Sequence, residues 1–472
     1  MLTYNSGNVE DIMKKMDAKL STLVFDETSQ NDMKIFRGLF LQLLTEPSTI
    51  NWNDMEKINP EKQIDYHNLP QIITAEEASH VLSKVAVLKL NGGLGTTMGC
   101  KGPKSLIPIK DNKTFLEFAV NQNDALNHKF NTTVPLYLLN SFNTEPETLS
   151  YQSARAGTLN FVSFNQSKCP RIYDGGEDNL MPVPWSAQDN NDEAEKWYPP
   201  GHGNALITLY NTGVLDKLLS EGREIVFISN IDNTGATLDI NIAKAIVDGH
   251  ADYIMEVTNK TPMDTKGGTL IDIKRSTLVD TLDGPRVEVN RSVMHLEMPQ
   301  VPKDHVDDFC SMSEFKIFNT NNIWINLKVV KEKIHSMKME IIVNRKKLSN
   351  GRGVIQLETS IGGAIRNFDN WLAVHVGRHR FLPVKKTQDI MAIMSNLYYY
   401  DADDYALRLR LDRPIPDRAP VIKLSSEFDS VAEFQRRIPH IPDMKDLLSL
   451  TVKGDVTFGK NVTLKASLNY NV

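Results

Sequence analysis

The segment 85–109, VAVLKLNGGLGTTMGCKGPKSLIPI, constrains the fold of this chain more than any other stretch. Its first residues, Val85 to Leu90, form an apolar and partly β-branched run, which predicts a buried strand. Five glycines follow before any helical pattern begins, at positions 92, 93, 95, 99 and 102. Because glycine lacks a Cβ, the backbone N–H groups can approach an anion closely, and Lys101 and Lys104 add positive charge. The segment therefore predicts a strand followed by a phosphate-binding loop.

This loop differs from the two commonest phosphate-binding motifs. A P-loop requires a glycine followed directly by Lys and Ser or Thr, and neither lysine here follows a glycine. The dinucleotide fingerprint G-x-G-x-x-G fails because Met98 stands where the third glycine is required. A simple glycine-rich turn is the alternative. Each glycine costs about 0.5–1 kcal/mol in backbone entropy, however, so five of them disfavour that interpretation.

The composition is that of an ordinary globular protein with more than one domain. The chain has 472 residues, 41% hydrophobic and 24% charged. The net charge of −6 argues against nucleic acid as a partner. The sequence has neither a signal-peptide pattern nor an apolar run of the ~20 residues needed for a membrane span. Three cysteines without a framework or metal-ligand spacing fit a reducing compartment, so we expect a cytoplasmic protein without membrane partners.

Two patterns of apolar residues predict the secondary structure of most of the chain. Apolar residues between positions 9 and 46 recur at helical spacing, with a polar break around Glu27 to Asn31, which predicts two scaffold helices. From about Ala75 to Val376, short apolar strands alternate with amphipathic segments, as is typical of a largely parallel sheet built from β-α units. The expected strands include VPLYLLN (134–140), EIVFISNID (224–232) and YIMEV (253–257). Ligands of such a sheet bind at the carboxyl ends of its strands.

The tail has a different period. An apolar residue recurs every six positions, at Leu450, Val456, Val462 and Leu468. Hexapeptide periodicity is typical of a parallel β-helix, with an ordinary hairpin as the alternative. The open end of so short a β-helix exposes strand edges and is a candidate interface.

The motifs together resemble those of one family. The loop pattern L-x-G-G-x-G-T-x-M-G-x-K-G-P-K is similar to the signature of the eukaryotic UTP–glucose-1-phosphate uridylyltransferases. The resemblance continues in the same order through most of the chain, in FNQSKCPRI (164–172), WYPPGHG (197–203), FISNIDNTGA (227–236), KGGTL (266–270), FKIFNTNNIWI (315–325) and FLPVKKT (381–387).

The resemblance implies an α/β fold with a Rossmann-like, GT-A-like nucleotidyltransferase domain and a mixed, mostly parallel sheet. The expected division is an N-terminal helical segment (1–75), the central domain (76–376) and a C-terminal domain (377–472) that ends in a short left-handed parallel β-helix. The family joins UTP and glucose 1-phosphate into UDP-glucose and releases pyrophosphate. One anion attacks another in that reaction, so lysines and Mg²⁺ must offset charge, while little acid–base work is needed.

By resemblance, nucleotide contacts lie in the glycine loop and after the strand 224–232. Gln166 is expected to pair with uracil through its amide, and Asp232 to hold Mg²⁺. A surface glutamine and a helix-capping aspartate are the alternatives for these two residues. The expected nucleotide-binding residues are Leu90, Asn91, Gly92, Gly93, Lys104, Gln166, Gly201, Asn230, Ile231, Asp232 and Lys385.

The same resemblance assigns catalytic and sugar-binding residues. Lys104 and Lys385 are the expected catalytic residues, near the triphosphate and the departing pyrophosphate. Lys385 is chosen by register alone, since Lys386 stands where relatives usually carry an uncharged residue. His202 is expected to contribute a hydrogen bond and charge rather than act as a general base. The residues expected at glucose 1-phosphate are Gly92, Gly93, His202 and Asn321, with Gly267, Gly268 and Glu297 as weaker candidates.

Three features depart from the family pattern. The family's GHGD ends in Asn204 here, which removes one carboxylate. The segment between Leu270 and Gln300 is longer than usual, which predicts an extra hairpin with a DGPR turn at 283–286. Relatives continue past GDVTFGKNV with further β-helix coils that carry subunit contacts in the animal and fungal proteins. A homo-oligomer formed through the C-terminal β-helix is therefore left open.

Two other functions stay open at this stage. A UDP-sugar or UDP-N-acetylhexosamine pyrophosphorylase would share the fold and the glycine loop. A catalytically silent paralogue that binds nucleotide-sugar is the alternative from a different class, motivated by Asn204 and the insertion.

Overall fold

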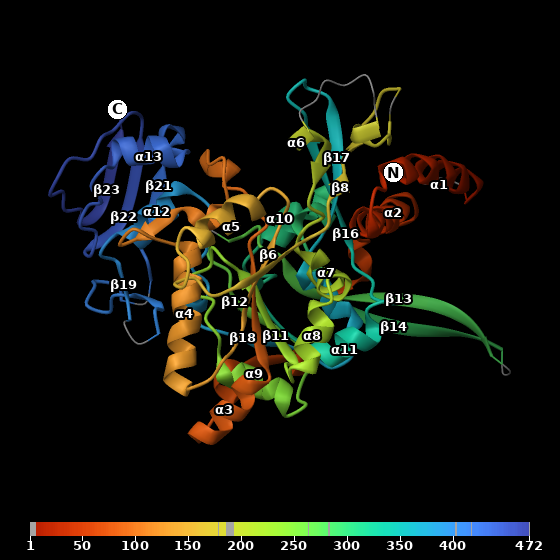
Figure 1. Cartoon of the computed structure of the whole chain (residues 1–472), viewed down its shortest axis with the longest axis horizontal. Helices are drawn as coiled ribbons and strands as arrows, with labels where there is room; N and C mark the ends of the chain where they lie inside the picture. Colours follow the sequence, from red (N-terminus) through yellow and green to blue (C-terminus); the bar gives the residue numbers. More distant parts are fainter. Residues whose placement is uncertain are drawn as a thin grey trace. The chain divides into compact units, whose positions relative to one another are not determined.

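The computed structural model describes residues 6–177, 179–185, 193–262, 264–281, 284–401, 404–416 and 418–471. The chain forms two compact units, and Figure 1 labels their elements. Unit 1 consists of Met1–Pro70, Asn165–Ile225 and Lys244–Val376, and unit 2 of Gln71–Phe164, Val226–Ala243 and Gly377–Val472. The three-domain division expected from the sequence stays a prediction.

Unit 1 contains a four-strand array in the order β2-β18-β12-β15, with bounds Gln63–Asp65, Trp371–His375, Tyr253–Asn259 and Ile317–Asn326. The pairs β2/β18 and β18/β12 are parallel, and β12/β15 is antiparallel. The expected strand YIMEV lies within β12. The helices of this unit are α1 (Ser6–Leu20), α2 (Glu27–Thr45), α6 (Glu193–Lys196), α7 (Ala205–Asn211), α8 (Val214–Ser220), α10 (Val306–Cys310) and α11 (Leu327–Lys333). Its shorter strands are β1 (Met55–Glu56), β8 (Cys169–Pro170), β9 (Ile172–Tyr173), β10 (Trp197–Tyr198), β16 (Ile341–Lys347) and β17 (Gly353–Thr359).

The two N-terminal helices form as predicted, but the break between them lies earlier than the polar residues indicate. Asp26 caps α2 by accepting a 2.7 Å hydrogen bond from Ser29 N, and the Ser29 hydroxyl accepts one from Asp26 N. This reciprocal capping box starts a helix among polar residues. The segment 27–31, predicted as the break, is therefore the first turn of α2.

The predicted extra hairpin is present in unit 1. The strands β13 (Thr269–Thr281) and β14 (Gly284–Leu296) pair in antiparallel register along their whole length, and Figure 1 shows them as a long ribbon. The predicted turn at 283–286 is wrong in position, because Gly284 already pairs with Thr281. Asp283 lies outside the described residues.

Unit 2 contains the strand order β11-β3-β6-β7, with bounds Ile225–Asn230, Val85–Leu90, Leu136–Asn140 and Val162–Asn165. Strands β3 and β6 are parallel, so the predicted strands 85–90, 134–140 and 224–232 are confirmed. The helices of the unit are α3 (Ala75–Ser83), α4 (Phe115–Phe130), α5 (Glu145–Ser153), α12 (Thr387–Met394) and α13 (Val431–Arg437), and α9 (Ile240–Val247) begins in it. Its small paired strands are β4 (Pro108–Lys110), β5 (Lys113–Thr114), β19 (Tyr398–Tyr400) and β20 (Leu407–Leu409).

The hexapeptide region forms a parallel sheet of β21 (Val421–Leu424), β22 (Leu447–Lys453) and β23 (Ala466–Asn471). Leu450 pairs with Ile422 on one side and with Leu468 on the other. Leu450 and Leu468 are three six-residue repeats apart, which excludes the hairpin alternative for these strands. One apolar core joins Met98 of the glycine loop to Leu450 of this sheet.

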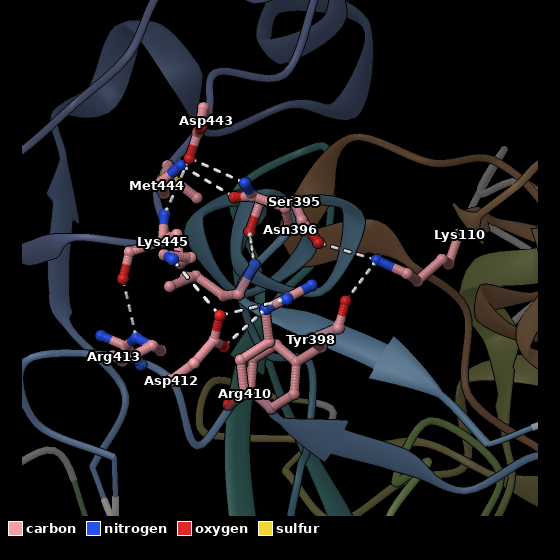
Figure 2. Close-up of polar contacts among 11 residues, drawn as sticks. Lys110, Ser395, Asn396, Tyr398, Arg410, Asp412, Arg413, Asp443, Met444 and Lys445 are labelled. Carbon is pink, nitrogen blue, oxygen red and sulfur yellow. Dashed lines mark hydrogen bonds and ion pairs between the residues drawn. The ribbon is translucent and has the colours of Figure 1, made fainter.

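Polar contacts fasten α12 and β22 within unit 2. The Lys110 ammonium donates 2.7 Å hydrogen bonds to the carbonyls of Ser395 and Tyr398, just after α12 (Figure 2). A cation at the carbonyl end of a helix also interacts favourably with the helix dipole. Buried Arg413 donates to the carbonyls of Lys445 and Leu447, both at 3.0 Å. Helix α12, which directly follows Lys385 and Lys386, is thus fixed at its far end.

In the part of the chain that the structure describes, no helix has the length and apolar character needed to cross a membrane.

Candidate functional site

The glycine loop of unit 2 follows β3 directly and is closed by its own backbone. Lys104 N donates to the Gly93 carbonyl and Gly95 N to the Gly102 carbonyl, each at 3.3 Å. The Ser141 hydroxyl, which follows β6, donates to the Gly92 carbonyl at 2.9 Å. The loop is therefore preformed at the carboxyl ends of β3 and β6, where ligands of parallel sheets bind.

The glycines of the loop serve different purposes. A Cβ at Gly95 would lie 2.8 Å from Cys100, one at Gly99 2.6 Å from Ser430, and one at Gly102 2.2 Å from Glu147. Gly99 also has a φ of +67°. A Cβ at Gly93 would meet no atom within 4 Å. Packing explains Gly95, Gly99 and Gly102, so the prediction that all five glycines admit a phosphate is too broad. Gly93, in contrast, faces open space.

Lys104 joins the loop to two distant segments of unit 2. Its ammonium donates to an Asp232 carboxylate oxygen and to the Val384 carbonyl. Both side chains are partly buried, with 19% and 17% of their area exposed. Asp232 lies two residues past the end of β11, and Val384 directly precedes Lys385. The structure thus brings Lys104, Asp232 and the backbone of Lys385 together.

Asp389 of α12 fixes the backbone of both candidate lysines at the start of that helix. Its Oδ2 accepts from Lys385 N at 2.7 Å and from Lys386 N at 2.9 Å. Burial raises the pKa of the Asp389 carboxyl, which these hydrogen bonds and the charges of Lys104 and Lys385 oppose. The side chains of Lys385 and Lys386 are both exposed. Asp389 therefore holds the backbone of both lysines, and the choice of Lys385 over Lys386 stays a prediction.

Other expected nucleotide residues line the carboxyl ends of β3 and β11. Asn91 is 2% exposed, and its amide donates to Asn140 at 2.7 Å and to Thr148 at 3.2 Å. These two bonds occupy its amide nitrogen, whereas its Oδ1 has no hydrogen-bond partner among the described residues. Ile231 is buried and donates its N–H to the Leu90 carbonyl at 3.2 Å, which ties β11 to β3. Asn230 is partly buried at the end of β11.

Unit 1 carries the loop that is expected to bind the uracil base, and this loop begins at Gln166. Gln166 is 8% exposed, and its Oε1 has no hydrogen-bond partner among the described residues. The neighbouring Ser167 N donates to Asn204 Oδ1 at 2.8 Å, and the Thr208 hydroxyl donates to the same oxygen at 2.7 Å. Asn204 thus performs an anchoring role that a carboxylate oxygen could also perform.

Asp32 is a second anchor of this loop, and no sequence pattern predicted it. Asp32 lies in α2 and accepts hydrogen bonds from Lys168 N and the Ser167 hydroxyl. Burial raises the pKa of its carboxyl to about 6. Helix α2 is therefore more than scaffold, because it holds the residues that follow Gln166.

His202 is a neutral group in this structure. Burial lowers its pKa from 6.5 to about 4, and nearby His295 adds to this effect while Glu297 opposes it. Its Nδ1 accepts a 3.1 Å hydrogen bond from Ile361 N, which leaves the proton on Nε2. Near pH 7 the desolvated ring is therefore neutral in the chain without ligand, and its expected contact with the sugar phosphate stays a prediction. The ring remains a hydrogen-bond donor.

Gly201, with a φ of +83°, packs against the Thr359 carbonyl, where a Cβ would lie 2.5 Å away.

Asn321 of β15 has a left-handed backbone with a φ of +60°. This conformation is uncommon for a residue other than glycine and is often found at functional sites. Its N–H donates to Asn319 Oδ1 at 2.7 Å. Asn319 and its neighbour His295 were missed by the sequence interpretation, because alternating residues in strands look like ordinary packing positions.

Unit 2 offers a metal ion one candidate carboxylate, Asp232, rather than a full set of protein ligands. Among the described residues no group of three or more His, Cys, Asp and Glu side chains could hold a metal ion. Mg²⁺ in phosphate-transfer sites is often held by one or two carboxylates and completed by substrate phosphates and waters. Asp232, a partly buried carboxylate that pairs with Lys104, is of the kind that this use of Mg²⁺ requires.

A glycine loop closed by its own backbone at the carboxyl ends of parallel strands, with Lys104 and Asp232 beside each other, is typical of phosphate-binding α/β proteins. A model of the UTP–glucose-1-phosphate uridylyltransferase family matches residues 33–465. The chain belongs to this family.

Relatives are similar over nearly the whole chain. The UTP–glucose-1-phosphate uridylyltransferase of Solanum tuberosum is 40% identical, with 99% of this chain and 94% of the relative covered. Uridylyltransferase 2 of Dictyostelium discoideum is 43% identical over 97% of this chain and 88% of its own length. A mutant UDP-glucose pyrophosphorylase of Leishmania major, solved in complex with UDP-glucose, has a TM-score of 0.82 at 30% identity, with 99% and 97% covered.

Proposed function

We propose that this chain transfers the uridylyl group of UTP to glucose 1-phosphate, forming UDP-glucose and pyrophosphate. The observation that carries the proposal is the match to relatives of that activity over 97–99% of this chain. The sugar phosphate attacks the α-phosphorus of UTP in line, and the bond to the leaving pyrophosphate breaks. The nucleophile is already an anionic oxygen, so positioning and charge stabilisation supply most of the rate.

Unit 2 supplies the charge in this proposal. Lys104 and Lys385 would stabilise the triphosphate and the departing pyrophosphate. The open space at Gly93 supports close approach of a phosphate to the backbone. Asp232 would hold Mg²⁺, which neutralises phosphate charge when bound. Leu90, Asn91, Gly92, Asn230 and Ile231 would complete the nucleotide contacts.

Unit 1 supplies recognition. The unpartnered Oε1 of Gln166 supports a base contact, because a buried amide oxygen needs a hydrogen-bond donor and N3–H of uracil is one. His202 would donate from Nε2 to the sugar phosphate, and Asn321 would bind glucosyl hydroxyls. Gly201 keeps the backbone of that loop close to Thr359.

The proposal also includes the β-helix, the oligomeric state and the location of the protein. The parallel sheet of β21, β22 and β23 with its hexapeptide spacing supports one coil of a left-handed β-helix. A homo-oligomer formed through this region and a cytoplasmic location stay predictions. Ultracentrifugation and localisation of a fluorescent fusion would test them.

The experiment that tests the function measures pyrophosphate release from UTP and Mg²⁺ with each of three sugar phosphates. Release with glucose 1-phosphate that exceeds release with galactose 1-phosphate and N-acetylglucosamine 1-phosphate is the expected result. A preference for the acetylated sugar would make the chain a UDP-N-acetylhexosamine pyrophosphorylase. No turnover by folded protein that binds UDP-glucose would identify a silent paralogue.

A further inference from the structure

His295 in unit 1 is a titratable side chain that the proposed reaction does not use. It lies on β14 with 1% of its side-chain area exposed. Burial lowers its pKa, so the ring is neutral near pH 7. Burying an imidazole costs free energy unless its nitrogens are satisfied, so its partners indicate why it is there.

One ring nitrogen of His295 connects to Asn321. His295 Nε2 lies 3.2 Å from Asn319 Nδ2, and Asn319 Oδ1 accepts from Asn321 N at 2.7 Å. The bond from Asn321 identifies the oxygen of the Asn319 amide, so the amide nitrogen donates to Nε2. The ring proton of neutral His295 must then be on Nδ1.

The other ring nitrogen faces Glu297. His295 Nδ1 lies 3.6 Å from Glu297 Oε1 and has no hydrogen-bond partner among the described residues. This separation is too long for a hydrogen bond, yet a small shift would close it. Glu297 has 29% of its side-chain area exposed, so its carboxylate is accessible to a ligand while the histidine is not.

Two glycines shape the backbone around the ring. A Cβ at Gly268 would lie 2.6 Å from His295 Nε2, and one at Gly362 2.6 Å from Nδ1. Gly362 follows Ile361, whose N–H binds His202 Nδ1. The ring therefore fits between two segments that only glycine permits, and one of them also orients His202.

We propose that His295 is the positioning residue of the sugar half of the site, holding Asn321 through Asn319 and orienting Glu297 toward the glucosyl group. This inference rests on the proposed function and deepens it. Asn321 needs such support because its left-handed backbone, with a φ of +60°, is strained for a residue other than glycine. After the small shift that closes the 3.6 Å gap, the Nδ1–H group of His295 would donate to Glu297 and orient its carboxylate toward the sugar hydroxyls, from which a carboxylate accepts hydrogen bonds well.

Two conservative substitutions separate the connection from His295 to Asn319 and Asn321 from the contact between His295 and Glu297. His295→Gln places an amide oxygen near the position of Nε2 and keeps an acceptor for Asn319. His295→Asn places an amide N–H near the position of Nδ1 and keeps a donor toward Glu297. His295→Leu removes both. His375→Gln is the matched control, because His375 Nε2 lies 3.1 Å from Asn259 Oδ1 on another strand pair of the same unit.

The first readout is steady-state kinetics. We expect His295→Leu to raise the KM for glucose 1-phosphate at least 10-fold with less than a 2-fold change in the KM for UTP. The Gln and Asn variants should each restore part of the loss, and His375→Gln should match the wild type. An equal rise in both KM values, or a His295→Leu variant with wild-type constants, would overturn the proposal.

The second readout does not depend on turnover. Calorimetry gives the ratio of the Kd for UDP to the Kd for UDP-glucose, which reports the glucosyl contacts alone. This ratio should fall at least 5-fold in the Gln and Asn variants, which also carry the test if His295→Leu does not fold. An unchanged ratio contradicts the inference. If the wild type shows no turnover but the Kd ratio still depends on His295, the proposed function is refuted and the inference remains supported.

Discussion

Unit 2 carries a charged pair among its candidate residues, Lys104 and Asp232, whereas Gln166, His202 and Asn321 of unit 1 are neutral. Unit 2 brings Lys104, Asp232 and the backbone of Lys385 together. Unit 1 offers the amides of Gln166 and Asn321 and the neutral imidazole of His202, whose pKa burial lowers to about 4. In the proposed reaction, unit 2 would stabilise phosphate charge and unit 1 would bind the base and the sugar. Substitutions should therefore affect turnover in unit 2 and substrate affinity in unit 1.

The largest effect is expected at Lys385. Lys385→Ala should lower kcat by about 100-fold to 1000-fold, the range for loss of one charge-stabilising group. The fold should persist, because Asp389 binds the backbone N–H and not the side chain. Steady-state kinetics with Lys386→Ala as the matched control check this. If Lys386→Ala were the slow variant, the register would be wrong by one residue.

Asp232→Asn should give the next largest effect. The amide keeps the shape but loses the charge, so we expect kcat to fall by about 10-fold to 100-fold and the midpoint of the Mg²⁺ titration to rise. Asp111→Asn is the control, since Asp111 is in the same unit at a turn with a φ of +50°, which asparagine tolerates. An unchanged Mg²⁺ midpoint would remove Asp232 as the metal ligand.

The neutrality of His202 predicts a pH-dependent stability. The folded pKa of about 4 lies below the unfolded value of 6.5, so the unfolded chain binds more protons between these pH values. Folding stability from this residue is present above pH 6.5 and is lost as the pH falls toward 4. Urea unfolding should show wild type losing up to about 2 kcal/mol relative to His202→Asn between pH 7.5 and 5. A relative gain on acidification would mean that His202 is charged in the folded protein.

The smallest effect is expected at Asn204, where the family carries aspartate. An aspartate oxygen can accept from Ser167 N and Thr208 as Asn204 Oδ1 does, so kcat and KM of Asn204→Asp should stay within about 3-fold of wild type. Because the side chain is 3% exposed, the buried charge should cost about 1 kcal/mol of stability. Asn204→Leu, which removes the acceptor, should raise the KM for UTP. Equal KM values for the two variants would contradict the anchoring role.

The sequence predicted the parts of the site that one local segment encodes. The strand 85–90 and the glycine loop are adjacent in the chain, so apolar patterning and glycine spacing were sufficient to find them. It did not predict why Gly99 and Gly102 are glycines, because Ser430 and Glu147 reach them from distant segments. Packing partners of this kind leave no trace in a local pattern.

Residues that act through another residue were also beyond sequence reasoning. Asp32 lies in a helix whose apolar spacing indicates only packing, and its partners Ser167 and Lys168 are far along the chain. His295 alternates with apolar residues in a strand, where a buried histidine is ordinary. The start of α2 was missed for a different reason, because the capping box at Asp26 and Ser29 uses the same polar residues that indicate a break.

The contacts of Lys104 also set when the molecule can become active during its synthesis. Its two acceptors lie 128 and 280 residues further along the chain. Contacts between such distant segments form late in folding, since the loop between them must close first. A growing polypeptide that ends before Val384 holds the glycine loop but lacks the carbonyl that fixes its lysine. In the proposed reaction, turnover would therefore require a polypeptide that has been synthesised past Val384.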